Sequence, residues 1–147
     1  MQIPQNIHNR TRYLDRIQPF MGKNIIKVFT GQRRVGKSYL LFQLMAFLQK
    51  QDKNVAIIYI NKEDLAFSSI QTATDLQEYV MANKSKKSKT YVFIDEIQDI
   101  LHFETALRSL LLYEDLDLYC TGSNANLLSG DIAGHLSGRY IEIVVYS

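Results

Sequence analysis

The feature that most constrains the fold is the segment GQRRVGKS at positions 31–38. Two glycines are separated by four residues, and the second is followed by lysine and serine. An apolar run at 25–29 comes directly before the segment, and apolar residues recur at helical spacing after it, as far as Gln51. A glycine-rich turn between a buried strand and a helix is an arrangement that binds phosphate groups. The segment therefore predicts an α/β fold with a phosphate-binding loop.

The residue types of this loop suit contact with a polyphosphate. Glycines permit a close approach of the backbone, successive N–H groups can surround an anion, and the start of a helix adds its positive dipole end. We expect Lys37 to bridge the β- and γ-phosphates and the Ser38 hydroxyl to bind Mg²⁺. A chance match is the alternative, and the strand and helix on either side disfavour it. The expected nucleotide-binding residues are Gly31, Gln32, Arg33, Arg34, Val35, Gly36, Lys37, Ser38 and Tyr39.

For Arg33 and Arg34, three interpretations stay open: contact with phosphate, contact with a protein partner, or solvation alone. The first of these adds positive charge beside the phosphates. The motif itself requires neither arginine, because its backbone and its lysine are the groups that hold phosphate.

Strands and helices are expected to alternate along the rest of the chain. Short apolar runs are typical of strands that are covered on both faces, and stretches with helical spacing separate them. This alternation predicts a parallel sheet with helices on both sides. The further strands are expected at 55–60, 91–94, 116–120 and 140–146, and the further helices at 10–17, 72–82, around 103–111 and at 126–136.

Two acidic residues, Asp95 and Glu96, follow the apolar run within YVFIDEIQ. They come at the carboxyl end of an expected strand, where open parallel sheets bind their ligands. We expect Asp95 to hold the Mg²⁺ shell through water and Glu96 to orient and activate an attacking water. The alternative is that the two carboxylates open the next loop or cap its helix.

Polar residues also follow the next apolar run, in CTGSNANLLS. Ser123 is the first candidate, and Asn124 the second, for a side chain that reaches the γ-phosphate or the water. Both are also good turn and helix-capping residues. Arg139, just before the last apolar run, is a candidate to stabilise transition-state charge in its own subunit or in a neighbour's. The alternative is a surface arginine at the start of a strand.

Size and composition exclude several classes of protein. The 147 residues are expected to form one domain, with residues 1–22 as a short N-terminal extension. A formal charge of +2 lacks the basic excess of most nucleic-acid binders, so nucleic-acid binding stays open as a role but is without support from the charge. Cys120, the single cysteine, excludes an internal disulfide. No apolar run reaches the roughly 20 residues of a membrane helix, and no signal peptide is evident. We therefore expect a cytoplasmic protein.

Taken in order, GQRRVGKS, YVFIDEIQ, TGSNANLLS and LSGRYIEI resemble the AAA+-like P-loop ATPases of bacteria and archaea. More narrowly, they resemble ATPases in which an N-terminal AAA domain precedes a C-terminal domain of unknown function. The likeness runs from about Tyr13 to the last residue. It implies a three-layer P-loop NTPase fold with a five-stranded parallel sheet in the order 5-1-4-3-2. It also implies Walker A at 31–38, Walker B at Asp95 and Glu96, sensor 1 at Ser123 or Asn124, and an arginine finger at Arg139.

The resemblance further implies ATP as the nucleotide. The C-terminal half of that family is not found in these 147 residues, so we expect an ATPase-domain fragment or a truncated gene product. The expected function is Mg²⁺-dependent binding and hydrolysis of ATP that drives a partner domain or a homo-oligomer. The alternative is a nucleotide-gated switch with little turnover. The expected catalytic residues are Lys37, Glu96, Ser123 and Arg139, and the expected metal ligands are Ser38 and Asp95.

Overall fold

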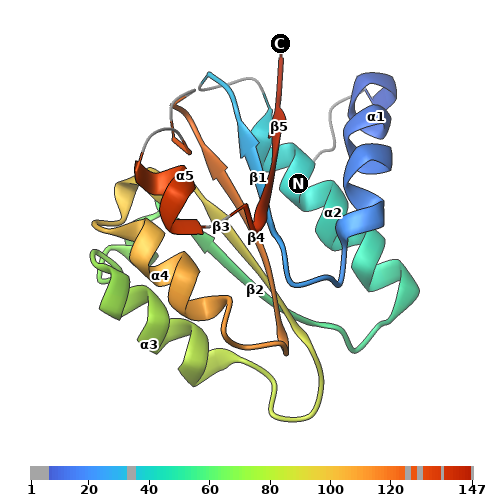
Figure 1. Cartoon of the computed structure of the whole chain (residues 1–147). Helices are drawn as coiled ribbons and strands as arrows, with labels where there is room; N and C mark the ends of the chain where they lie inside the picture. The colour runs from blue at the N-terminus through green and yellow to red at the C-terminus, as the bar shows by residue number, and fades with distance from the viewer. Residues whose placement is uncertain (1–6, 33–35, 125–126, 129–130, 137, 147) are drawn as a thin grey trace.

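Five parallel strands form one sheet at the centre of the molecule (Figure 1). The computed structural model describes residues 7–32, 36–124, 127–128, 131–136 and 138–146. The spatial order is β2-β3-β4-β1-β5, and every neighbouring pair is parallel. The expected order 5-1-4-3-2 is therefore confirmed. The strands are β1 (Ile26–Thr30), β2 (Ala56–Asn61), β3 (Thr90–Asp95), β4 (Leu116–Gly122) and β5 (Tyr140–Val144).

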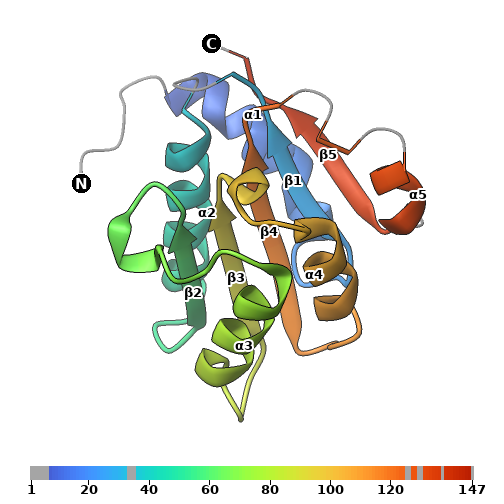
Figure 2. The ribbon, with the colours of Figure 1, turned by 90° about the vertical axis from the view of Figure 1, so that its left-hand side faces the viewer.

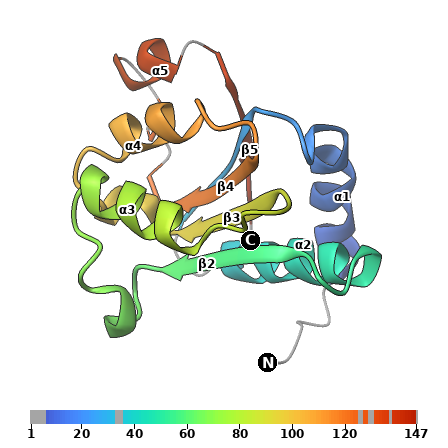
Figure 3. The same cartoon turned by 90° about the horizontal axis from the view of Figure 1, so that it is seen from below.

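Helices cover both faces of the sheet, as the alternation of elements predicts (Figures 1 and 3). Two helices lie on one face, α1 (Ile7–Ile17) and α2 (Lys37–Gln51). The other face carries α3 (Ala73–Asn83), α4 (Phe103–Leu110) and α5 (Asp131–Leu136). The described residues also include three short 3₁₀ turns: η1 (Gln18–Phe20), η2 (Leu65–Phe67) and η3 (Ile97–Asp99).

Several boundaries differ from the sequence expectations. The first helix begins at Ile7 and not at residue 10, and the last helix is described only over Asp131–Leu136, since part of the expected 126–136 lies outside the described residues. Strands β1 to β4 each extend one or two residues further toward their carboxyl ends than the apolar runs do. The extra residues are polar or glycine, which hydropathy alone does not assign to strands.

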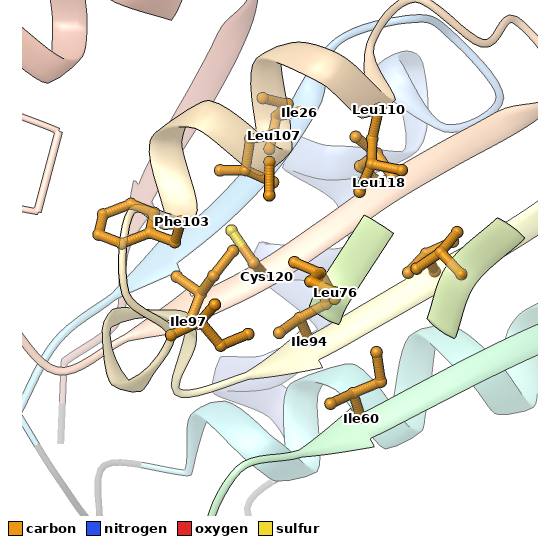
Figure 4. Close-up of a cluster of buried hydrophobic side chains, with 14 of the residues drawn as sticks. Ile26, Ile60, Leu76, Ile94, Ile97, Phe103, Leu107, Leu110, Leu118 and Cys120 are labelled. Atoms are coloured by element: carbon orange, nitrogen blue, oxygen red, sulfur yellow. The ribbon is translucent and has the colours of Figure 1, made fainter. Parts of the chain in front are cut away.

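Side chains of the strands alternate between two buried clusters, one on each face of the sheet. In β1, Val28 packs with the α3–α4 cluster and Phe29 with the α1–α2 cluster. Figure 4 shows Cys120 of β4 in the first of these clusters, between Ile97 and Leu107. Burial raises the pKa of the Cys120 thiol to about 12, so this residue is a core side chain.

The parallel arrangement brings the carboxyl ends of β1, β3 and β4 to one edge of the sheet, beside the first turn of α2 (Figure 2). This edge carries the phosphate-loop segment after β1, the acidic pair at the end of β3 and the polar tip after β4. Parallel sheets bind ligands at this edge. The fold therefore places three of the predicted motifs together.

Candidate nucleotide-binding site

The phosphate-loop segment joins β1 to α2. Gly31 and Gly36 have φ values of 154° and 89°, which favour glycine. The Gly31 N–H donates to the Gly122 carbonyl at 3.3 Å, so the start of the segment is held against the end of β4. Gly36 is the N-cap residue of α2, and the first N–H groups of a helix lack partners within the helix. Arg33, Arg34 and Val35 lie outside the described residues, so their expected contacts stay predictions.

Lys37 connects the loop with the ends of β3 and β4. Its side chain is buried, and Nζ donates to the Gly31 carbonyl and to the Gln32 carbonyl, the latter at 3.0 Å. Nζ also donates to Ser123 Oγ at 3.3 Å and lies 4.0 Å from Glu96 Oε1. The structure therefore brings three of the expected catalytic residues to one point.

Asp95 lies beside Ser38, with three hydroxyl groups around its buried carboxylate. Ser38 Oγ donates to Oδ2 at 2.5 Å, and the Tyr59 hydroxyl donates to the same oxygen at 3.1 Å. Thr121 Oγ1 donates to Oδ1 at 2.6 Å. Alternation along the strands places Tyr59, Asp95 and Thr121 on the face that α2 covers. Ser38 and Asp95 were expected here from the sequence, whereas no part in the site was expected for Tyr59 or Thr121.

Tyr59 remains a hydrogen-bond donor at ordinary pH. Burial raises the pKa of its phenol, and the negative charge of Asp95 raises it further. Its ring packs edge-on against Phe42, with centroids 5.3 Å apart, and Phe42 in turn contacts Tyr39 in the first turn of α2. These contacts fix the phenol relative to the phosphate-loop helix.

The Ser38 and Asp95 oxygens fit a magnesium ion. Mg²⁺ prefers oxygen ligands, keeps several waters and is commonly held by one or two protein groups together with substrate phosphates. Among the described residues, no group of three or more His, Cys, Asp or Glu side chains could hold a metal ion. An ion at this position would therefore take its other ligands from phosphate and water.

Glu96 directly follows β3 and has an unusual backbone, with φ 63° and ψ 59°. This left-handed conformation is uncommon for residues other than glycine and costs about 1–3 kcal/mol. The Glu96 N–H donates to Thr121 Oγ1 at 2.9 Å. Ser123 Oγ lies 2.8 and 2.7 Å from the two carboxylate oxygens, and Gln98 Nε2 donates to Oε2. The Glu96 carboxylate is thus held by Gln98 of η3, which follows β3, and by Ser123, which follows β4.

The structure distinguishes between Ser123 and Asn124, the two candidates at the tip of β4. Ser123 contacts Lys37 and Glu96, and its N–H donates to Gln98 Oε1 at 3.4 Å. The Asn124 side chain is exposed, and its backbone carbonyl accepts the N–H of Leu127 at 3.1 Å. Ser123 is therefore the candidate that lies in the site. Gln98 is the last residue of YVFIDEIQ, but no role was expected for it, because only the acidic residues of that segment suggest chemistry.

Arg139 lies away from this site in its own chain. It immediately precedes Tyr140, which is in register with Ile26 at the start of β1. Gly31 follows the end of β1, five residues further on, or about 17 Å along an extended strand. The guanidinium donates to the Leu111 carbonyl at the end of α4, at 3.2 Å. A role in its own subunit does not fit this position, and a role in a neighbour's site stays a prediction.

The geometry agrees with the comparison to known families. A family model described as "AAA domain" matches residues 23–147. The chain belongs to the AAA domain family. Membership supports a nucleotide-binding function of the ATPase type for this AAA domain.

Two curated relatives of this AAA domain are longer proteins. An uncharacterized protein of Haemophilus influenzae is 39% identical over 140 residues, which cover 94% of this chain and 35% of the relative. An uncharacterized protein of Methanocaldococcus jannaschii is 37% identical over 119 residues, covering 81% of this chain and 26% of the relative. The chain thus spans about a third or less of the length of these relatives.

Solved structures share the fold at low sequence identity. The structure of the Aeropyrum pernix ORC1 protein in complex with DNA has a TM-score of 0.63 at 13% identity, covering 99% of this chain and 47% of that one. The structure of C. elegans PCH-2 has a TM-score of 0.59 at 17% identity, covering 92% of this chain and 39% of that one. These similarities support the P-loop NTPase fold. Separately, no helix in the described part of the AAA domain is long and apolar enough to cross a membrane.

Proposed function

We propose that this AAA domain binds ATP with Mg²⁺ through residues 31–39 and hydrolyses the bond between the β- and γ-phosphates. One observation carries the proposal: the first turn of α2 meets the ends of β3 and β4. There Lys37 contacts Ser123 and lies near Glu96, while Ser38 contacts Asp95. A cation, a metal-binding pair and a carboxylate base are thus adjacent, as phosphoryl transfer to water requires.

Each group has a part that follows from its chemistry. The Lys37 ammonium and the N–H groups at the start of α2 stabilise negative charge on phosphate oxygens. Ser38 and Asp95 would hold the magnesium ion, which neutralises charge on the β- and γ-phosphates. Glu96 accepts a proton from the attacking water, and Ser123 and Gln98 orient its carboxylate. The preference for ATP rests on family membership, because the phosphate loop does not contact the base. A cytoplasmic location stays a prediction.

A nucleotide-gated switch is the second candidate function, and the lysine contacts favour it. Lys37 donates to two carbonyls of its own loop, and the Glu96 carboxylate is engaged by Ser123 and Gln98. A triphosphate that takes the Lys37 ammonium must replace these carbonyl contacts, which couples binding to loop rearrangement. Switching of this kind needs little turnover, and it would act on a partner domain or a second copy of the chain.

Replacing Lys37 by alanine should weaken ATP binding by about 10- to 100-fold, since hydrogen bonds to charged groups contribute about 1.5–3 kcal/mol. Isothermal titration calorimetry measures the affinity. Lys50→Ala is the matched control, because Lys50 is exposed in the last turn of the same helix. Lys50→Ala should bind ATP as the wild type does. Unchanged affinity in Lys37→Ala, with the fold intact by circular dichroism, would contradict the placement of the phosphates.

Arg139→Ala tests the role in a neighbour's site. If Arg139 acts there, the variant should hydrolyse ATP at least about tenfold more slowly, while its ATP affinity stays nearly unchanged. Mixing Arg139→Ala with Lys37→Ala should restore activity, because a mixed assembly contains a site with both residues. If Arg139 only caps α4 through Leu111, hydrolysis should persist in Arg139→Ala and the domain should lose about 1 kcal/mol of stability.

A further inference from the structure

Thr121 lies between the two acidic residues of the site and forms a hydrogen bond with each of them. It is the sixth residue of β4, its side chain is fully buried, and it faces the α2 side of the sheet together with Asp95. Its hydroxyl donates to Asp95 Oδ1 at 2.6 Å and accepts the Glu96 N–H at 2.9 Å. One oxygen atom therefore contacts both the expected metal-binding carboxylate and the residue that carries the expected base.

We propose that Thr121 is a positioning residue that fixes the metal-binding carboxylate and the catalytic base relative to each other. This inference rests on the proposed ATP hydrolysis. Thr121 does not contact the Glu96 carboxylate and acts through the backbone N–H of that residue. Residues that orient the ligands of a metal site often change activity or metal affinity by about 10- to 100-fold when they are replaced.

The direction of the two hydrogen bonds explains why a hydroxyl is needed. A hydroxyl has one proton to donate and lone pairs to accept with. The proton goes to Asp95, so a lone pair faces the Glu96 N–H. Neither the Asp95 carboxylate nor the Glu96 N–H can move away from Thr121 without leaving a buried polar group without this partner, which is costly.

The hydrogen bond between Thr121 and the Glu96 N–H matters because the Glu96 backbone is strained. Its left-handed conformation is strained for a residue with a side chain, and such strain persists only where the surroundings enforce it. The bond to Thr121 is one constraint on the Glu96 N–H, and it holds the backbone at the point where the chain turns from β3 into η3. With the backbone so held, the carboxylate meets Ser123 and lies near Lys37. Loss of the bond would let this carboxylate turn away from the water that it activates.

Three variants of the full 147-residue chain separate positioning from packing. Thr121→Val keeps the shape of the side chain and removes the hydroxyl. Thr121→Ser keeps the hydroxyl and removes a methyl group. Tyr59→Phe removes a hydrogen bond to Asp95 Oδ2 and leaves both hydrogen bonds of Thr121 in place, because Thr121 contacts Asp95 Oδ1 and the Glu96 N–H.

We expect Thr121→Val to lower kcat by about 10- to 100-fold with KM for ATP nearly unchanged. Thr121→Ser should recover most of this loss. Tyr59→Phe should raise the Mg²⁺ concentration that is needed for half-maximal activity and should lower kcat less than Thr121→Val does. A wild-type kcat in Thr121→Val, or a Thr121→Ser variant as slow as Thr121→Val, would overturn the proposal, because the methyl group and not the hydroxyl would then matter.

A measurement without nucleotide keeps this test independent of ATP hydrolysis. Amide hydrogen exchange, followed by NMR, should show that the Glu96 N–H exchanges at least about tenfold faster in Thr121→Val than in the wild type, with the Ile94 N–H in β3 unaffected. Thr121→Ser should retain the wild-type protection. Equal protection of the Glu96 N–H in the wild type, Thr121→Val and Thr121→Ser would overturn the proposal. If the wild type fails to hydrolyse ATP, the proposed function fails, and this exchange still decides whether Thr121 constrains Glu96.

Discussion

Replacing Glu96 by glutamine should lower the rate of ATP hydrolysis by about 10²- to 10⁴-fold, the usual contribution of a positioned general base. Glutamine preserves the shape of the side chain and can still contact the Ser123 hydroxyl, but it cannot accept a proton from water. Lys37 and Ser38 are untouched, so ATP affinity should stay nearly unchanged. Single-turnover hydrolysis with enzyme in excess over ATP measures the chemical step directly.

Asp99→Asn is the matched control for Glu96→Gln. Asp99 lies three residues further on, within η3, and its side chain is exposed. Asp99→Asn also removes one carboxylate charge, but it should hydrolyse ATP at the wild-type rate. If the wild type and Glu96→Gln hydrolyse ATP equally slowly while both bind it, Glu96 is not a base and the nucleotide-gated switch is the better account.

Replacing Asp117 by alanine should lower the free energy of unfolding by about 3–5 kcal/mol, because it leaves a buried lysine without its counter-charge. Asp117 in β4 forms an ion pair with Lys27 in β1, and both side chains are fully buried. Asp117 Oδ2 also accepts the Gly22 N–H at 2.8 Å and the Tyr119 hydroxyl at 2.6 Å. Urea unfolding of the variant and the wild type measures the difference. A loss below about 1 kcal/mol, the size of an ordinary hydrogen bond, would contradict the role of the pair.

Lys27→Met combined with Asp117→Ala separates the buried charge from the lost hydrogen bonds. The double variant should be more stable than Asp117→Ala alone, since no uncompensated ammonium remains. A double variant less stable than Asp117→Ala would contradict this explanation. Burial already lowers the pKa of Lys27, and the charge of Asp117 opposes that shift. Without Asp117, folded Lys27 binds fewer protons than unfolded lysine, so the stability of Asp117→Ala should rise with pH.

Local patterns in the sequence predicted the main elements of this fold, and the structure confirms the sheet order. The phosphate-loop segment and the acidic pair could be located because glycine and charged residues interrupt apolar runs at strand ends. Tyr59 could not be located in this way, because an aromatic residue inside the strand AIIYIN looks like an ordinary core side chain. Its place beside Asp95 follows only from the alternation of side chains and from the neighbouring strand. Thr121 was given no part in the site, since nothing local shows that β4 continues as far as Gly122.

Long-range contacts account for the remaining differences. The pair of Lys27 and Asp117 joins residues 90 positions apart, and a lysine within an apolar strand gives no sign of its partner. The position of Arg139 relative to the phosphate loop also depends on strand direction. In a parallel sheet, a residue before one strand and a residue after its neighbour lie at opposite edges. The distance between Arg139 and the phosphate loop can be worked out only once the register of β1 and β5 is known.

The most direct test of the central claim, that residues 31–39 together with Asp95 bind a triphosphate and Mg²⁺, is calorimetry. ATP, GTP and ADP are each titrated into the wild-type chain with Mg²⁺ and again with a chelator in its place. We predict saturable binding of ATP with one site per chain, which weakens clearly when Mg²⁺ is removed and when the γ-phosphate is absent. No saturable binding of ATP, or equal affinities for ATP and ADP with and without Mg²⁺, would contradict the account.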